Sequence, residues 1–255
     1  MLTAITRGVS AALVNCELTF VDRAPIDLEK AVQQHHSYQK MLETFGAQVQ
    51  SLPPENTMPD SMFVEDPAIV LDEVAVIFPL GTESRRAEAV SLALAIAAYR
   101  PLKHVKLPGT VEGGDILRIG RHLFAGLSKR TSDEGIRQLR SIVEPFHYWV
   151  IAVPVTGCLH LKSAVTFLGR NTLLANRQWF DAAIMTGFDW IDVAPEEPHA
   201  ANALAFGKTV ILPASFPLTR ARIEARGFEV MPLDISELQK AESGLTCSSL
   251  LFDAQ

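Results

Sequence analysis

ILRIGRHLFA, at residues 116–125, consists of two short apolar runs separated by Gly120 and Arg121. A glycine-containing turn between two such runs is typical of a β-hairpin. The same pattern recurs in three further segments, residues 68–78, 165–175 and 203–212. We therefore expect four similar hairpins along the chain.

Each hairpin is followed by a stretch with helical character and then by a short strand that ends near a proline. The expected helices cover residues 84–99, 132–146, 176–185 and 217–226, and the expected strands cover residues 105–108, 150–154, 190–195 and 228–232. A fifth unit starts with a helix at 28–45 and a strand at 49–54. The terminal segments 2–6 and 247–252 can pair as its hairpin, which also protects sheet edges. The pattern predicts about five ββαβ units.

The polar residues just before the hairpins recur at nearly constant spacing. They are Glu65, Glu112, His160, Asn202 and Cys247, at intervals of 47, 48, 42 and 45 residues. Equivalent positions in repeated units around a pseudo-symmetry axis lie close together in space. We therefore expect these side chains at one central site. An ordinary α/β sheet with accidental spacing is the alternative.

The composition is that of a globular protein, with 48% hydrophobic residues, 20% charged residues and a net charge of −6. The absence of a Lys/Arg-rich run disfavours nucleic acid and anionic membranes as partners. The most apolar window, residues 89–99, is too short to span a bilayer. The N-terminus has no signal-peptide pattern. We expect a cytoplasmic protein whose partner is a small molecule, with a homodimer as the candidate assembly.

Two residues at the recurring position could carry out nucleophilic chemistry, Cys247 in SGLTCSSLLF and His160 in GCLHLKS. A free cysteine is more often an inert core residue, but the shared position favours a catalytic role. A nearby cation favours the thiolate, and a histidine can protonate a leaving group and later activate water. The other two cysteines, Cys16 and Cys158, lack this support. The adjacent histidines His35 and His36 are expected on a solvated helix face.

Acidic residues gather around the same positions. Glu112 and Asp115 flank two glycines in EGGD, and Glu65 and Asp66 are adjacent, with Asp60 just upstream. Acids at the edge of a core raise the free energy of folding unless a cation meets them. Together with the cysteine and the histidine they indicate a guanidinium, which offers five N–H donors to carboxylates. A metal ion is the rival ligand, and solvated acids are the ordinary interpretation.

Two arginines are candidates for binding the carboxylate of an amino-acid substrate. Arg85 begins an expected helix, where the helix dipole disfavours a cation. Arg130 lies in GLSKRTS. Solvated side chains are the ordinary interpretation of both.

Seven motifs in order along the chain resemble those of the dimethylarginine dimethylaminohydrolases, in the guanidino-group-modifying superfamily that includes the arginine deiminases. They are PDSMFVED (59–66), ESRR (83–86), EGGDIL (112–117), GLSKRT (126–131), LHLKS (159–163), AAN (200–202) and GLTCSS (244–249). The resemblance implies a single catalytic domain over residues 1–255, built as a five-bladed α/β propeller. It also implies hydrolysis of Nω-methylated arginine to citrulline and an alkylamine, with no metal or organic cofactor.

The resemblance further implies a role for each candidate residue. Cys247 would attack the guanidinium carbon to form a covalent thiouronium, and His160, oriented by Glu112, would protonate the departing amine and then activate water. The expected substrate-binding residues are Glu65, Asp66 and Asp115 around the guanidinium, Asp60 and the carbonyl of Leu18 at the α-amino group, and Arg85 and Arg130 at the α-carboxylate.

Two segments depart from the family pattern. FPLGTESRR, at residues 78–86, lacks the basic residue of the related RPGAESRR, and the expected closing loop within residues 13–27 aligns loosely. Arginine itself or another guanidino or ureido compound therefore remains an alternative substrate. A catalytically silent propeller that binds a cationic ligand is the alternative of a different class.

Overall fold

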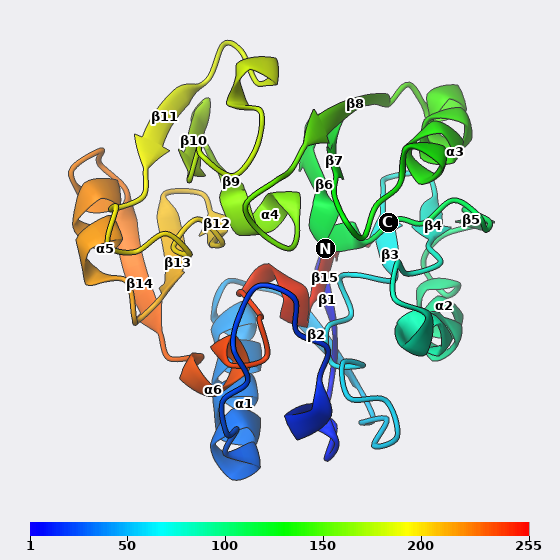
Figure 1. The fold of residues 1–255 in the computed structure, drawn as a ribbon, viewed down its shortest axis with the longest axis horizontal. Coiled ribbons are helices and arrows are strands. Elements are labelled where there is room, and N and C mark those ends of the chain that lie inside the picture. Colours follow the sequence, from blue (N-terminus) through cyan, green and yellow to red (C-terminus); the bar gives the residue numbers. More distant parts are fainter. Residues whose placement is uncertain (255) are drawn as a thin grey trace.

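The computed structural model describes residues 1–254, in which five three-stranded sheets are arranged like blades around a central axis (Figure 1). In each blade the inner and middle strands form an antiparallel hairpin, and the outer strand runs parallel to the middle strand. This order of strands is the predicted ββαβ unit. The expectation of a five-bladed α/β propeller is therefore confirmed.

The first blade joins the two ends of the chain, as predicted. It consists of β15 (Leu250–Asp253), β1 (Leu2–Arg7) and β2 (Gln48–Leu52). The other blades follow in sequence and consist of β3 (Ala68–Val70), β4 (Ala75–Ile77) and β5 (Leu102–His104); β6 (Ile116–Ile119), β7 (His122–Leu127) and β8 (Trp149–Pro154); β9 (Val165–Gly169), β10 (Thr172–Ala175) and β11 (Asp189–Asp192); and β12 (Leu204–Phe206), β13 (Thr209–Pro213) and β14 (Glu229–Leu233).

Helices connect the middle and outer strands on the periphery of four blades (Figure 1). They are α1 (Leu28–Thr44), α2 (Ala89–Ile96), α3 (Asp133–Val143) and α5 (Pro217–Glu224). Local sequence fixes where two of them begin, because the side chains of Asp27 and Ser132 accept hydrogen bonds from the first turns of α1 and α3. None of the helices in residues 1–254 is long and apolar enough to cross a membrane.

The expected helix at residues 176–185 is wrong. In its place the fourth blade has turns and the short 3-10 helix η5 (Ala182–Ile184). Phe180 pairs with Val155 in an isolated β-bridge, and the ring of Trp179 packs against His199. These contacts with distant segments override the local helical preference.

Shorter helices lie before inner strands, within the connections from middle to outer strands, and near the chain ends. They are η1 (Leu13–Asn15), η2 (Glu83–Glu88), η3 (Gly113–Asp115), η4 (Glu144–Phe146), α4 (Leu161–Ala164), α6 (Ser236–Gln239) and η6 (Thr246–Ser248). The expected helix at 84–99 is therefore divided into η2 and α2. The last strand begins at Leu250 rather than at Cys247, which lies in η6.

The apolar core is divided among the junctions between neighbouring blades. Each of five buried clusters combines residues from two adjacent blades, such as Leu117 and Phe124 of the third blade with Val165 and Leu173 of the fourth. The inner strands surround a cavity of 270 Å³ near the axis. Apolar side chains such as Val70, Leu117 and Phe167 line much of this cavity, together with the polar residues Glu65, Lys162 and Thr246.

Candidate active site

The residues predicted to share a position do meet at one end of the central axis. Glu65 precedes β3, Glu112 precedes η3 and β6, and His160 precedes α4 and β9. Cys247 lies in η6 just before β15, and its carbonyl accepts a hydrogen bond from the Glu65 amide at 3.3 Å. Residues that are 40 to 50 positions apart in sequence therefore form one cluster because each blade delivers its inner strand from the same direction.

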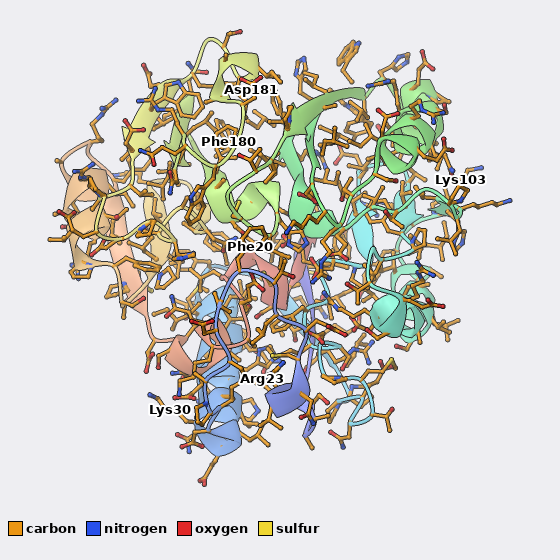
Figure 2. All side chains as sticks on the ribbon, in the orientation of Figure 1. Phe20, Arg23, Lys30, Lys103, Phe180 and Asp181 are labelled. Carbon is orange, nitrogen blue, oxygen red and sulfur yellow. The ribbon has the colours of Figure 1, made fainter. Side chains whose placement is uncertain are left out.

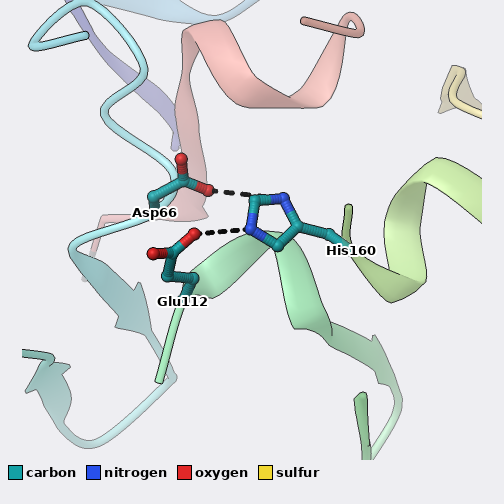
Figure 3. A group of neighbouring side chains, drawn as sticks. All are labelled: Asp66, Glu112 and His160. Carbon is teal, nitrogen blue, oxygen red and sulfur yellow. Dashed lines mark hydrogen bonds and ion pairs between the residues drawn. The ribbon is translucent and has the colours of Figure 1, made fainter. Parts of the chain in front are cut away.

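His160 is buried between two carboxylates (Figure 3). Its Nε2 donates to Glu112 Oε2 at 2.6 Å, and its Nδ1 lies 4.0 Å from Asp66 Oδ1. Gly114 makes this placement feasible, because a Cβ there would lie 2.5 Å from His160 Nδ1. The glycine pair in EGGD thus permits close packing of the imidazole against the backbone.

The two members of the His160–Glu112 pair have strongly shifted pKa values. Burial alone would lower the pKa of His160, but Asp66, Glu112 and Asp115 together raise it to about 9. Burial alone would raise the pKa of Glu112, but the hydrogen bond and charge of His160 and the two nearby arginines lower it to about 2. At neutral pH the pair is an imidazolium and a carboxylate.

The Cys247 thiol has the opposite environment. Burial, together with the charges of Glu65 and Asp66, raises its pKa to about 12. The thiol is therefore protonated at neutral pH in the substrate-free protein. A ligand that brought positive charge between Cys247 and these two carboxylates would favour the thiolate.

Asp66 has one oxygen engaged and one free. Its Oδ2 accepts from Arg85 Nη1 at 3.0 Å, whereas its Oδ1 is buried without a hydrogen-bond donor among residues 1–254. A buried carboxylate oxygen without a donor destabilises the fold unless a ligand supplies one. This oxygen, beside His160 Nδ1, is where a cationic donor would bind.

The other expected guanidinium ligands are held by the protein itself. Glu65 pairs with Lys162 and accepts from Thr246 Oγ1 at 2.7 Å. Asp115 accepts from the Leu161 amide at 2.9 Å and from Ser128 Oγ at 2.7 Å. Both acids therefore stabilise the segments that carry His160 and Cys247. Burial raises the pKa of Asp115 to about 6.

Both candidate arginines are buried at the site and are not solvated. Arg85 forms a bidentate pair with Glu88, at 3.0 Å for each contact, in addition to its bond to Asp66. Arg130 Nη1 lies 3.4 Å from Glu112 Oε1. Burial opposes the charge of Arg85, but Asp66, Glu88 and Glu112 raise its pKa. Both cations therefore offset the charge of the buried acids around His160.

The residues expected at the α-amino group lie beside the loop that follows η1. Asp60 is buried, and its Oδ2 accepts from the Glu17 amide at 3.1 Å. Leu18, the next residue, is partly buried against the apolar cluster between the fifth and first blades. The loop therefore approaches Asp60 at the position that the sequence indicated.

Three supporting residues were not identified from the sequence. Lys162 neutralises Glu65, Glu88 holds Arg85, and Asn202 donates to Thr246 Oγ1 and to the Lys162 carbonyl, both at 3.0 Å. Asn202 was noted at the recurring position without a role. The spacing of Arg85 and Glu88 on one helical face was the signal for that pair.

The nearest arrangement to a metal site is formed by Asp66, Glu112 and His160, whose potential ligand atoms lie within 4.8 Å of one another. Their chemistry fits a metal poorly. His160 carries a proton on the nitrogen that bonds Glu112, and Arg85 and Arg130 already place positive charge beside the two acids. A metal ligand histidine must be neutral at the bonding nitrogen.

Comparisons with known proteins show which family the chain resembles over most of its length. Residues 29–211 match the model of the arginine deiminase family. The N(G),N(G)-dimethylarginine dimethylaminohydrolases of Pseudomonas aeruginosa and Streptomyces coelicolor are 37% and 36% identical to this chain, over 89% and 97% of it and 90% and 95% of their own lengths.

Solved structures of dimethylarginine dimethylaminohydrolases are also similar to this chain in fold and sequence. A cysteine-to-serine mutant of the Pseudomonas aeruginosa protein, complexed with citrulline, superimposes with a TM-score of 0.91 at 34% identity and covers 99% of this chain and all of that chain. A histidine-to-glycine mutant of a dimethylarginine dimethylaminohydrolase, solved as an adduct with S-methyl-L-thiocitrulline, gives a TM-score of 0.93 at 35% identity, with the same coverage.

Proposed function

The chain belongs to the arginine deiminase family and, within it, to the dimethylarginine dimethylaminohydrolases, and from this we propose that it hydrolyses Nω-methylated arginine to citrulline and an alkylamine. The observation that best supports this function is the free Oδ1 of Asp66 beside a protonated His160. A guanidinium N–H would satisfy that oxygen, and the leaving nitrogen would then lie next to an acid.

In the first half of the reaction, Cys247 is the proposed nucleophile. The substrate cation offsets the charges of Glu65 and Asp66, so the thiol gives up its proton to solvent when the substrate binds. The sulfur then adds to the guanidinium carbon. As the bond from that carbon to the alkylated nitrogen breaks, His160 Nδ1 gives its proton to the departing amine, because Nε2 is held by Glu112.

In the second half, the neutral imidazole of His160 takes a proton from water, and the resulting hydroxide adds to the carbon of the thiouronium. The carbon–sulfur bond then breaks, and the proton of the added hydroxyl passes to the departing sulfur, so citrulline is released and the thiol of Cys247 is restored. The adduct of a related structure with S-methyl-L-thiocitrulline is consistent with such a covalent intermediate. Covalent catalysis divides one difficult hydrolysis into two easier steps.

The roles of the remaining residues form part of the proposal. Arg85 and Arg130 would bind the α-carboxylate, and Asp60 with the carbonyl of Leu18 would bind the α-amino group. Asp66 would hold the guanidinium directly. Glu65 and Asp115, whose oxygens are already bonded to the protein, would act by positioning Cys247 and His160. The whole chain would act as one catalytic domain.

The proposal also covers the partner, the cellular location and the assembly of the protein. The substrate is a small amino acid, and three free thiols, Cys16, Cys158 and Cys247, support a location in the reducing cytoplasm. We further propose a homodimer as the assembly to be tested by light scattering.

The decisive experiment measures citrulline release from arginine, monomethylarginine and both dimethylarginines. We expect release from monomethylated and asymmetrically dimethylated arginine, and its loss in Cys247→Ser. Cys158→Ser is the matched control, because that buried thiol only donates to the His160 carbonyl, which a hydroxyl also does. Turnover of arginine alone would instead assign the protein to deimination, and wild-type activity in Cys247→Ser would exclude the mechanism.

A further inference from the structure

The loop at residues 16–27 crosses the mouth of the site between η1 and α1 without helix or strand structure. Figure 2 places Phe20, at its tip, near the centre of the molecule and Arg23 closer to the end of α1. Such a segment must be fixed by side chains from elsewhere, because it has no backbone ladder of its own.

The base of this loop is tied to the segment around α6. Glu237 Oε2 accepts from the Asp27 amide at 2.9 Å, and Lys240 Nζ donates to the Pro25 carbonyl at 2.9 Å. Within the loop, Arg23 donates to the carbonyls of Val14 and Cys16 at 2.7 and 2.6 Å. The base therefore has several attachments that do not involve the active site.

The tip is held by one side chain from that same segment. Both carboxylate oxygens of Glu242 accept backbone N–H groups, from Thr19 at 2.6 Å and from Phe20 at 2.9 Å. On the opposite side of the mouth, Arg130 Nη2 donates to Thr19 Oγ1 at 3.1 Å. The tip thus bridges Glu242, five residues before Cys247, and an arginine that contacts Glu112.

Packing contributes little to holding the tip. Phe20 and Val21 line a cavity of 340 Å³ together with residues such as Cys158 and Gly244, and Phe20 remains 38% exposed. The inner side of the tip faces this cavity, and a cation–π contact holds the Phe20 ring, whose centroid lies 5.1 Å from the Lys129 ammonium. The charge-assisted hydrogen bonds to Glu242 are the stronger restraint.

The backbone at Glu242 supports a special role for its side chain. Its φ is 57°, in the left-handed region that glycine adopts without strain. A glutamate in this conformation is strained, and such strain in native proteins is concentrated at functional positions. The carboxylate that bonds two loop amides gives a reason for a glutamate to stand there.

We propose that Glu242 is a positioning residue that latches the tip of the loop over the bound substrate. The predicted effect of the latch on KM rests on the proposed function. Its predicted effect on access to Cys247 does not. When the Glu242 carboxylate is lost, the tip, including Thr19, can move away from Arg130. The base of the loop stays attached. The chemical step at Cys247 and His160 is unchanged once the loop closes.

Glu242→Gly removes the carboxylate but leaves the backbone conformation in place, because glycine keeps the same φ without strain. The variant therefore tests the side chain alone. We expect KM for asymmetric dimethylarginine to rise about tenfold and kcat to change less than about twofold, from the loss of two charge-assisted hydrogen bonds. Glu242→Gln, which retains one acceptor oxygen, should give a smaller rise. Glu229→Gln is the matched control, since that exposed glutamate lies on the outer strand β14.

A second measurement does not depend on turnover. Alkylation of substrate-free protein with iodoacetamide, followed by peptide mass spectrometry, should show Cys247 modified several times faster in Glu242→Gly than in the wild type and the control. Faster alkylation without any methylarginine hydrolysis would retain the latch and reject the proposed function. Unchanged alkylation and KM in both Glu242 variants, with normal wild-type turnover, would overturn the latch.

Discussion

The protein has two buried histidines whose charge states differ. His35 lies in α1 and is 1% exposed, and His160 is 3% exposed at the active site. Burial and the neighbouring His36 lower the pKa of His35 to about 4. Burial acts in the same direction on His160, yet its pKa is raised to about 9.

The difference lies in the partners. His35 stacks on Tyr38 and contacts Gln39, neutral groups from its own helix. His160 meets Asp66, Glu112 and Asp115, which come from neighbouring blades. A buried imidazole is therefore neutral by default, and only charges brought together by the propeller make it an acid at neutral pH.

Removing His160 should have the largest effect. His160→Gln keeps a polar side chain of similar size but cannot donate a proton to the leaving amine, so we expect kcat to fall about 10³-fold. Steady-state kinetics on asymmetric dimethylarginine measures the loss. His35→Gln is the control and should retain near wild-type kcat. An equal loss in both variants would show a structural cause.

Glu112→Gln should make His160 more like His35. The variant loses the negative charge and the strongest hydrogen bond to the imidazolium, so the pKa of His160 should fall from about 9 towards neutrality. His160 must be protonated for the first step, so the basic limb of the kcat/KM profile should move to lower pH. We expect a loss of about 10²-fold at pH 8. An unmoved basic limb would show that another group controls it.

His35 should have its effect on stability instead of catalysis. Its folded pKa of about 4 lies below the unfolded value, so the unfolded chain binds the proton more tightly, and stability falls as pH decreases from about 6.5 to 4. The loss from this group is about 2 kcal/mol between pH 7.5 and pH 5. Urea unfolding at both pH values should show a smaller decrease for His35→Leu than for the wild type. Parallel decreases would assign the acid sensitivity elsewhere.

The sequence predicted the site better than it predicted the partners of each residue. Hairpins with glycine turns and a regular interval were enough to bring Glu65, Glu112, His160 and Cys247 together, because equivalent positions in closed repeats must meet. It did not reveal that Lys162 neutralises Glu65. That pairing depends on how two side chains of adjacent blades extend, which no interval records.

The interpretation of His35 as a solvated residue was wrong for a similar reason. The pair His35-His36 appeared polar, but only His36 is exposed. Buried residues of α1 include Ala31, Tyr38 and Leu42 at helical spacing, and His35 lies on that same face. Periodicity therefore carried the answer, whereas residue type alone pointed to solvent.

The smallest expected effect comes from Asp115, the carboxylate that raises the pKa of His160 without bonding to it. Asp115→Asn keeps an acceptor for the Leu161 amide and can still pair with Ser128. We expect kcat/KM to fall only about threefold, with a basic limb displaced less than in Glu112→Gln. A ¹⁵N-histidine titration of both variants orders the two shifts. If Asp115→Asn moved the pKa as far as Glu112→Gln does, summed charge would govern His160; a smaller shift would assign that control to the Glu112 hydrogen bond.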